Sequence, residues 1–278
     1  MKKKNIIIKI GIATLVIITS FALGFLTAKN TQEMLQSKDQ NIEQKEPATE
    51  NSIIPEIITI TYIEENYETK NKNNVVITKN TRNIPDIKYS SNQQSADKIK
   101  KSLIDFSDSE WNNNIKYAAD ELVEDGIYDD LTEYDGLGAS LILENSKITN
   151  HRITFNLSLY GCFGGVGWNG YYGYNYDITT GELLTLESIS DNHSKLIDTI
   201  KIEINKKLNE LKEEIEIYDK SEEEINNLIN KEGNWYFTDT GIEIIFQEYE
   251  ISNGASGTII VTIDKKLIND YLKDEYKF

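Results

Sequence analysis

The feature that most constrains this chain is an uncharged apolar run of nineteen residues, from Ile10 to Ala28. As a helix it would be roughly 28 Å long, which is about the thickness of the hydrocarbon core of a bilayer. Four lysines precede the run, and positive charge favours the cytoplasmic side of a membrane. The sequence therefore predicts a single-pass membrane anchor over residues 1–28, with the rest of the chain outside the cell.

A cleaved signal peptide is the alternative interpretation of this run. Leu26-Thr27-Ala28 is compatible with a cleavage site, and cleavage would make the protein secreted. Signal peptides usually carry an apolar region of only about 7–15 residues, so the length of the run favours the uncleaved anchor. Residues 29–55 are polar, contain two prolines and show no sustained apolar period, which predicts a flexible linker.

Residues 56–278 show two kinds of hydrophobic periodicity. Apolar residues three and four apart predict helices over residues 95–125, 193–217 and 221–230, and a short helix near the C-terminus. Alternating or β-branched runs predict strands over residues 57–63, 75–77, 140–144, 153–160, 172–178, 235–237, 242–246 and 258–263. Because strands and helices do not alternate strictly, we expect an α+β fold. We expect antiparallel sheets with packed helices, in two adjoining subdomains behind the N-terminal transmembrane helix.

Two local details sharpen this prediction. Ser107-Asp108-Ser109-Glu110 contains residues that favour helix starts, so we expect the first helix to break there with a new N-cap. Thr179-Thr180-Gly181-Glu182 predicts a tight turn that leads into a further strand at residues 183–186.

The chain beyond residue 28 is strongly acidic. It holds 25 of the 29 basic residues and all 46 acidic residues, a formal charge of −21. This charge argues against nucleic acid or an anionic membrane surface as the partner. The acidity suits attraction to a basic protein, and it equally suits the solubility of an exported protein.

Few side chains are arranged for catalysis or metal binding. Cys162 is the only cysteine, which excludes an internal disulfide and a multi-cysteine zinc site. His151 and His193 lack the spacing of a metal motif. We therefore expect no metal, no cofactor and no enzymatic activity. Carboxylates are numerous, and a cell-wall hydrolase with a pair of acids stays as an alternative.

A glycine-rich segment runs from Gly161 to Gly170. A phosphate-binding loop would be followed by a helix, whereas a tyrosine-rich strand follows here, so we interpret the segment as a hairpin connection. Tyr172, Tyr174 and Tyr176 share one face of that strand. They either cover the core or form, at the Trp168 end, an exposed recognition surface.

The order of motifs around this loop resembles a pair of bacterial extracellular domains, DUF4163 and DUF3298. The motifs are the strand over 153–160, the glycine loop, Tyr176-Asp177, residues 180–186, Trp235-Tyr236-Phe237, Gly241-Ile242, Phe246, Tyr249-Glu250-Ile251 and Gly257. The resemblance spans residues 56–278, with 56–165 similar to DUF4163 and 166–278 similar to DUF3298. These domains occur in the RsiV-type anti-sigma factor that senses lysozyme, and beside the catalytic domain of some peptidoglycan deacetylases.

The resemblance implies a surface-anchored protein that binds lysozyme as a decoy, an inhibitor or an accessory receptor. Few residues precede the apolar run, so we expect no sigma-factor-binding segment, and the metal motif of a deacetylase is not found. The implied contacts lie in the glycine loop and in the loop after Ile251. The matching residues are Phe163, Gly164, Gly165, Trp168, Asn169, Tyr171, Ser252, Asn253, Ala255 and Ser256.

Phe163 and Trp168 are the expected anchors of this interface, since buried aromatic residues carry much interface energy. The loop after Ile251 lacks the proline and the aromatic residue that are common there in the family. A module that binds peptidoglycan is the other open possibility, with the Trp168–Tyr174 region stacking on sugar rings.

Overall fold

The computed structural model describes residues 58–165 and 167–278 of the chain. The predicted anchor (1–28) and linker (29–55) lie outside the described residues. Within the described part, no helix is both long and apolar enough to cross a membrane. The described residues belong to one compact unit.

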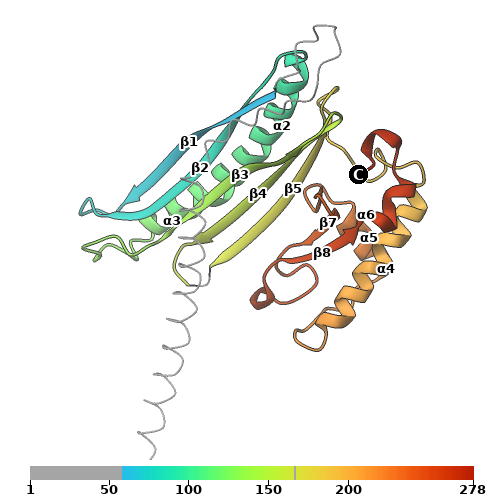
Figure 1. The fold of residues 1–278 in the computed structure, drawn as a ribbon. Coiled ribbons are helices and arrows are strands. Elements are labelled where there is room, and N and C mark those ends of the chain that lie inside the picture. Colours follow the sequence, from blue (N-terminus) through green and yellow to red (C-terminus); the bar gives the residue numbers. More distant parts are fainter. Residues whose placement is uncertain (1–57, 166) are drawn as a thin grey trace, which may run out of the picture. The chain divides into compact units, whose positions relative to one another are not determined.

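The first half of this unit is a five-stranded sheet in the order β1-β2-β3-β4-β5 (Figure 1). Its strands are β1 (Ile58–Lys70), β2 (Val76–Tyr89), β3 (Gly138–Ile148), β4 (Arg152–Cys162) and β5 (Trp168–Asp177). Neighbours are antiparallel except β2 and β3, which run parallel. The prediction of wholly antiparallel sheets is wrong at this pair, because the chain returns from β2 through a long helical crossover.

Amide side chains hold the β2–β3 junction together. The two strands pair directly only at Thr81–Ser140 and Arg82–Leu141. Beyond that point the Asn83 amide donates to the Leu143 carbonyl at 2.7 Å and accepts from the Leu143 N–H at 2.6 Å. On the other side the Asn80 amide accepts from Ala139 N–H at 3.0 Å. The predicted strand at 75–77 is therefore far too short, because polar residues continue it.

Helices cover one face of this sheet (Figure 1). They are α2 (Gln93–Glu110), a π-helical turn (Trp111–Lys116) and α3 (Tyr117–Glu124). The predicted break at residues 107–110 is wrong. Ser107 is buried, and Asp108 forms an ion pair with the buried Arg82 at 2.7 Å, so both residues serve Arg82 instead of capping a new helix. The N-cap is Asn92, which accepts from Ser95 N–H.

The core of this half lies between α2 and the sheet. Its buried residues include Ala96, Ile99, Leu103, Trp111, Ile115, Leu141, Leu143, Phe155, Leu157, Tyr174 and Tyr176. Phe106 packs its ring against Tyr172 and Tyr174, with both centroids at 5.2 Å. The core interpretation of the tyrosine stretch is thus confirmed for Tyr174 and Tyr176.

The second half is a three-stranded antiparallel sheet in the order β6-β7-β8. Its strands are β6 (Trp235–Phe237), β7 (Gly241–Phe246) and β8 (Ile259–Asp264), and its helices are α4 (His193–Leu211), α5 (Glu222–Ile229) and α6 (Lys265–Ile268). Short 3₁₀ turns follow at Gly254–Ser256, Asn269–Tyr271 and Asp274–Tyr276. The helices bury the apolar side of this sheet in a second core cluster.

Most predicted elements of this half are confirmed. Ser221 caps α5 in a reciprocal capping box with Glu224. The predicted helix over 193–217 ends earlier, at Leu211. The turn at 179–182 forms, but residues 183–186 make only a single bridge, between Leu183 and Tyr176. The predicted boundary at 165/166 falls between two paired strands, β4 and β5, and the domain division stays a prediction.

Asn175 joins the two sheets. Its side chain is 1% exposed. Its Oδ1 accepts from Phe237 N–H at 3.0 Å and from the Thr154 hydroxyl at 3.2 Å, and its Nδ2 donates to the Trp235 carbonyl at 3.1 Å. One amide thus satisfies β6 backbone groups that have no strand partner on that side.

Asp177 and Arg152 fix the C-terminal segment. Asp177 accepts from the N–H groups of Thr179 and Thr180 and from the Tyr276 hydroxyl. Arg152 is 2% exposed, lies 3.9 Å from the centroid of the Phe237 ring and donates to the Tyr276 carbonyl at 2.9 Å. Burial lowers the pKa of Arg152 to about 10, so its charge is present at neutral pH.

We expect Asn175→Ala to lower the free energy of unfolding by about 2–3 kcal/mol, because it leaves buried groups of β6 without a partner. Urea denaturation followed by far-UV circular dichroism measures this. Asn169→Ala, at an exposed position of the same strand, is the matched control and should cost well under about 1 kcal/mol. Equal losses in the two variants would contradict the joining role of Asn175.

Asp177→Asn should change the pH dependence of stability. Burial raises the pKa of Asp177, but its hydrogen bonds with Thr179, Thr180 and Tyr276 outweigh burial and hold the pKa below its usual value of 3.8. The carboxylate therefore stabilises the fold above pH 3.8, and this contribution is lost as the pH falls through the lowered pKa. Between pH 6 and pH 3 the variant should lose less stability than the parent. An identical slope in both proteins would contradict this.

Candidate functional site

Four loops meet at or beside one end of the five-stranded sheet. The β1–β2 loop (71–75), the segment before β3 (124–136) and the β4–β5 loop (163–167) lie at this end because of the strand directions (Figure 1). Residues 247–257 join them through hydrogen bonds to the start of β5. We call the described residues of 124–136, 160–171 and 247–257 the loop surface.

The predicted anchors lie side by side in the β4–β5 loop. The rings of Phe163 and Trp168 are 6.4 Å apart, and both side chains are half-buried. Trp168 pairs across the hairpin with Gly161, and a β-carbon at Gly161 would overlap the indole. The absence of a side chain at Gly161 is therefore what lets the indole lie flat on the strand.

The next glycine of this loop touches the segment before β3. A β-carbon at Gly164, which has a φ of +88°, would overlap the Tyr128 hydroxyl. Asn71 then fixes the segment from the other side, donating to the carbonyls of Tyr128 and Leu131, each at 3.1 Å. Segment 124–136 is thus held between two hairpin loops.

Segment 124–136 carries an unneutralised acidic surface. Asp129 pairs with Lys72 at 2.7 Å. The other acids of the segment are exposed, and none of them forms an ion pair with a lysine or arginine among the residues that the structure describes. They are Glu124, Asp125, Asp130, Glu133 and Asp135. The segment contains no basic residue.

Two polar side chains attach the loop over 247–257 to β5. The Gln247 amide accepts from Tyr171 N–H at 3.1 Å and donates to the Tyr171 carbonyl, so it pairs with the strand as a backbone would. Glu248 accepts from the backbone N–H and the amide of Asn169, at 3.2 and 3.3 Å. The two loops of the predicted site are therefore in direct contact.

The predicted residues of the second loop differ in accessibility. Ser252 is 1% exposed and forms a bridge with Ile217, so its side chain is not available at the surface. Asn253 and Ser256 are half-buried and bond to each other, with Ser256 Oγ 3.1 Å from Asn253 Oδ1. Of the predicted contact residues in this loop, only Ala255 is exposed, so the loop offers a narrow surface to a partner.

Tyr171 continues the site toward the second sheet. Its ring lies 5.9 Å from that of Tyr236, whose hydroxyl donates a short hydrogen bond to Glu243. Burial raises the pKa of Tyr171, and burial together with Glu243 raises that of Tyr236. Both phenols therefore stay neutral at physiological pH.

Sequence reasoning missed three exposed aromatic residues of the loop surface, Tyr134, Tyr160 and Tyr249. Tyr249 is 67% exposed and has a φ of +67°, an unusual backbone conformation for a residue with a side chain. Its ring packs on Gly254, where a β-carbon would overlap it. Tyr160 is 49% exposed beside the glycine loop. The alternation of β4 predicts that Tyr160 points outward. Nothing in the sequence indicates that the backbone of Tyr249 adopts the left-handed conformation.

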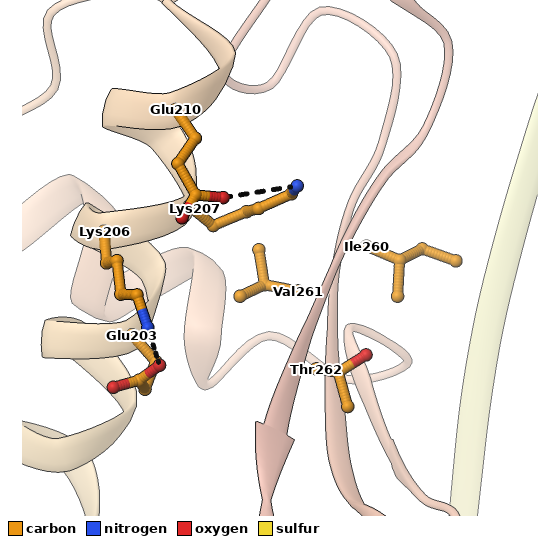
Figure 2. Close-up of a pocket in the computed structure, with 7 residues that line it drawn as sticks. All are labelled: Glu203, Lys206, Lys207, Glu210, Ile260, Val261 and Thr262. Carbon is orange, nitrogen blue, oxygen red and sulfur yellow. Dashed lines mark ion pairs between the residues drawn. The ribbon is translucent and has the colours of Figure 1, made fainter.

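Two clefts lie outside the loop surface. One of 520 Å³ lies beside α2 and includes Asp105, Glu182 and Glu232. Asp105 and Glu182 are bound to Lys101 and Lys98, so only Glu232 lacks an ion pair among the described carboxylates of this cleft. The other, of 420 Å³, lies between α4 and β8 (Figure 2).

Neither a metal centre nor a Cys–His pair is visible in the described part of the chain. No group of three or more histidine, cysteine or acidic side chains there is arranged to hold a metal ion. Cys162 ends β4, and His151 immediately precedes the same strand. At about 3.3 Å per residue they are roughly 35 Å apart, which excludes a catalytic pair.

We expect Gly161→Ala to push the indole of Trp168 off the strand and to increase quenching of its fluorescence by acrylamide. The matched control is Gly167→Ala in the same loop, where the nearest atom to a new β-carbon is 3.4 Å away. Both variants should be measured in a background with Trp111→Phe and Trp235→Phe. Unchanged quenching in Gly161→Ala would contradict this packing.

Comparison with known proteins identifies the second half of the unit. A family model described as "Protein of unknown function (DUF3298)" matches residues 187–266. A DUF3298 family protein of Bacteroides fragilis NCTC 9343 is similar in structure, with 14% identity and a TM-score of 0.53 over 79% of this chain and 95% of that chain. A DUF3298 family protein of Pseudomonas aeruginosa PAO1 matches with 15% identity and a TM-score of 0.47 over 80% of this chain and 96% of that chain.

At this identity the Bacteroides structure supports the fold alone. No curated protein matches the sequence. The family match covers α4, α5 and the second sheet, so the sequence similarity to the DUF3298 model is confined to this half of the unit.

Proposed function

We propose that this protein binds a basic protein through the loop surface, and that the basic protein is lysozyme. The observation that carries the proposal is the exposed acidic segment 124–136, which touches the glycine loop through Tyr128 and Gly164. The match to DUF3298, together with the sequence resemblance to the RsiV-type ectodomain, supports lysozyme as the partner.

The charge of the protein supports fast and selective encounter with such a partner. The chain carries a formal charge of −17 in total, and of the acids of segment 124–136 only Asp129 has an ion-pair partner among the described residues. Opposite charges steer diffusional encounter and raise association rates, with a strong dependence on ionic strength. The acidic segment therefore attracts the partner, and other side chains must hold it.

Aromatic side chains of the loop surface supply that contact area. Tyr249 and Tyr160 are exposed, and Phe163 and Trp168 are half-buried, with Trp168 lying over Gly161. Tyrosine and tryptophan contribute large contact areas at low entropic cost and are enriched among residues that dominate interface energies. With lysozyme bound at this site, the protein would act as a decoy, an inhibitor or an accessory receptor without chemistry of its own.

A cell-wall glycan is the second candidate ligand. The exposed rings of Tyr160 and Tyr249 favour it, because aromatic faces stack on sugar rings. Unlike lysozyme, a neutral glycan gains nothing from the acidic segment, so its binding should be insensitive to salt. Retention on purified peptidoglycan that lysozyme does not compete away would favour the glycan.

The direct test mixes the full chain in detergent with hen lysozyme in a calorimeter, and assays protection of purified cell walls from digestion. We expect binding at low salt that weakens and persists at 0.15 M salt, where the screening length is about 8 Å. No binding at low salt would overturn the proposal. Binding that vanishes entirely at 0.15 M salt would mean that charge attraction alone, and not a specific interface, holds lysozyme.

Neutralising the acidic segment should slow association. The triple variant Asp130→Asn, Glu133→Gln, Asp135→Asn should lower the association rate constant with lysozyme about tenfold at low salt, measured by surface plasmon resonance. The matched control Glu213→Gln, Glu214→Gln, Glu216→Gln removes the same charge from exposed positions after α4. An equal effect of both variants would mean that total charge, not the loop surface, directs the encounter.

A further inference from the structure

β8 is an edge strand whose outer side has no partner among the described residues. The second sheet ends with it, since β8 pairs with β7 alone. Hydrogen-bonded and non-hydrogen-bonded pairs alternate along an antiparallel ladder. Lys265 N–H donates to the Thr240 carbonyl at 2.9 Å, which sets the phase of the β7–β8 ladder.

Counting from that bond shows which backbone N–H and carbonyl groups of β8 face β7 and which face outward. The backbone groups of Ile259, Val261 and Ile263 face β7, opposite Phe246, Ile244 and Ile242. The Ile245 N–H bond to the Asn234 carbonyl agrees with this phase, because it directs the intervening residues of β7 toward β6. The N–H and carbonyl groups of Ile260 and Thr262 therefore face outward from the sheet.

This edge lacks the usual protection against strand addition. Exposed edges are commonly blunted by charge, proline or bulges. β1, the edge of the larger sheet, carries Glu64, Glu65 and Glu68. Residues 259–263 of β8 read Ile-Ile-Val-Thr-Ile, with no charge, no proline and high strand propensity.

A groove runs along this edge. Its volume is 420 Å³, and α4 forms its second wall with Glu203, Lys206, Lys207 and Glu210. Figure 2 shows Val261 pointing toward α4 and Ile260 pointing away from it. Lys206 and Lys207 are held by Glu203 and Glu210 at 3.7 and 3.6 Å, so their charges are balanced and their aliphatic stems line the groove.

We propose that this groove binds an extended segment of a basic partner protein, which adds to β8 as a fourth strand. Main-chain hydrogen bonds to Ile260 and Thr262 supply the affinity, and side chains at every second position of the segment face Val261 and α4. The groove itself is balanced in charge, so the preference for a basic segment comes from the −17 charge of the whole chain.

A second copy of the chain is the less favoured occupant. Antiparallel pairing of β8 with itself would bring two chains of charge −17 together. It would also place α4 beside its own symmetry mate, where the Glu-x-x-Lys-Lys-x-x-Glu order of residues 203–210 sets like charges opposite each other. Charge therefore favours a foreign, basic strand.

The test uses the full chain in detergent and the synthetic peptide Lys-Val-Thr-Val-Thr-Val-Thr-Lys, with single-residue hydrogen exchange as the readout. At a peptide concentration about ten times its dissociation constant, exchange of the Ile260 and Thr262 amides should slow about tenfold. The amides of Val261 and Ile263, already bonded to β7, should change little. Lysozyme is absent from this assay, so its failure is distinguishable from failure of the proposed function.

Thr262→Pro removes one outward N–H without touching the β7 ladder, and proline is tolerated at such edge positions. Protection of Ile260 by the peptide should be lost in Thr262→Pro and kept in Thr262→Ala, which retains the N–H. Circular dichroism checks the fold of both. If Thr262→Pro unfolds, Ile260→Pro replaces it, with protection of the Thr262 amide as the readout.

Four results would overturn the proposal. The first is no protection of Ile260 and Thr262 in the parent chain at saturating peptide. The second is protection that persists in a folded proline variant. The third is protection that rises with protein concentration without peptide, which would assign the edge to a second copy. The fourth is equal binding of a peptide with glutamates in place of the lysines, which would remove the preference for a basic partner.

Discussion

The arrangement of this fold depends on how the outer edge of β5 is satisfied. A strand with one free side exposes a row of donors and acceptors, and here both backbone and side-chain groups bond across that side. Gly173 N–H donates to the Gly233 carbonyl at 2.8 Å. The Asn175 side chain binds β6, and Gln247 binds the backbone of Tyr171. These bonds attach the second sheet to the larger sheet without a continuous ladder. They also bring the loop after β7 to the glycine hairpin, so the loop surface is a consequence of the same bonds.

Sequence periodicity predicted the elements whose apolar residues repeat regularly. The Ser221 cap, the strand at 235–237 and the long amphipathic helices all follow from local rules. The length of β2 does not, because Asn80, Arg82 and Asn83 interrupt any apolar pattern. Their side chains bond to β1, β3 and α2, and these partners are distant in sequence. Polar residues that act through long-range contacts look like loop residues when only neighbours along the chain are considered.

The candidate site shows the same division between local and long-range information. The glycine hairpin and its aromatic residues were recognisable from spacing, and Trp168 and Asn169 do lie beside the loop that follows β7. The burial of Ser252 depends on its bridge to Ile217, which no local pattern reveals. The acidic character of segment 124–136 is plain in the sequence. Its position next to the hairpin required the parallel β2–β3 pair, which places the start of β3 at that end of the sheet.

The π-helical turn at Trp111–Lys116 has a consequence for how this chain tolerates length changes. A π turn holds one residue more than a regular α-helix needs to keep the same faces aligned. Trp111 at its start, Ile115 within it and Ala119 after it all reach the core. Losing a single residue from this turn would let the backbone relax to ordinary α geometry while the following helix kept its rotation toward β1. The turn is therefore a place where this chain could lose one residue without rebuilding its interior.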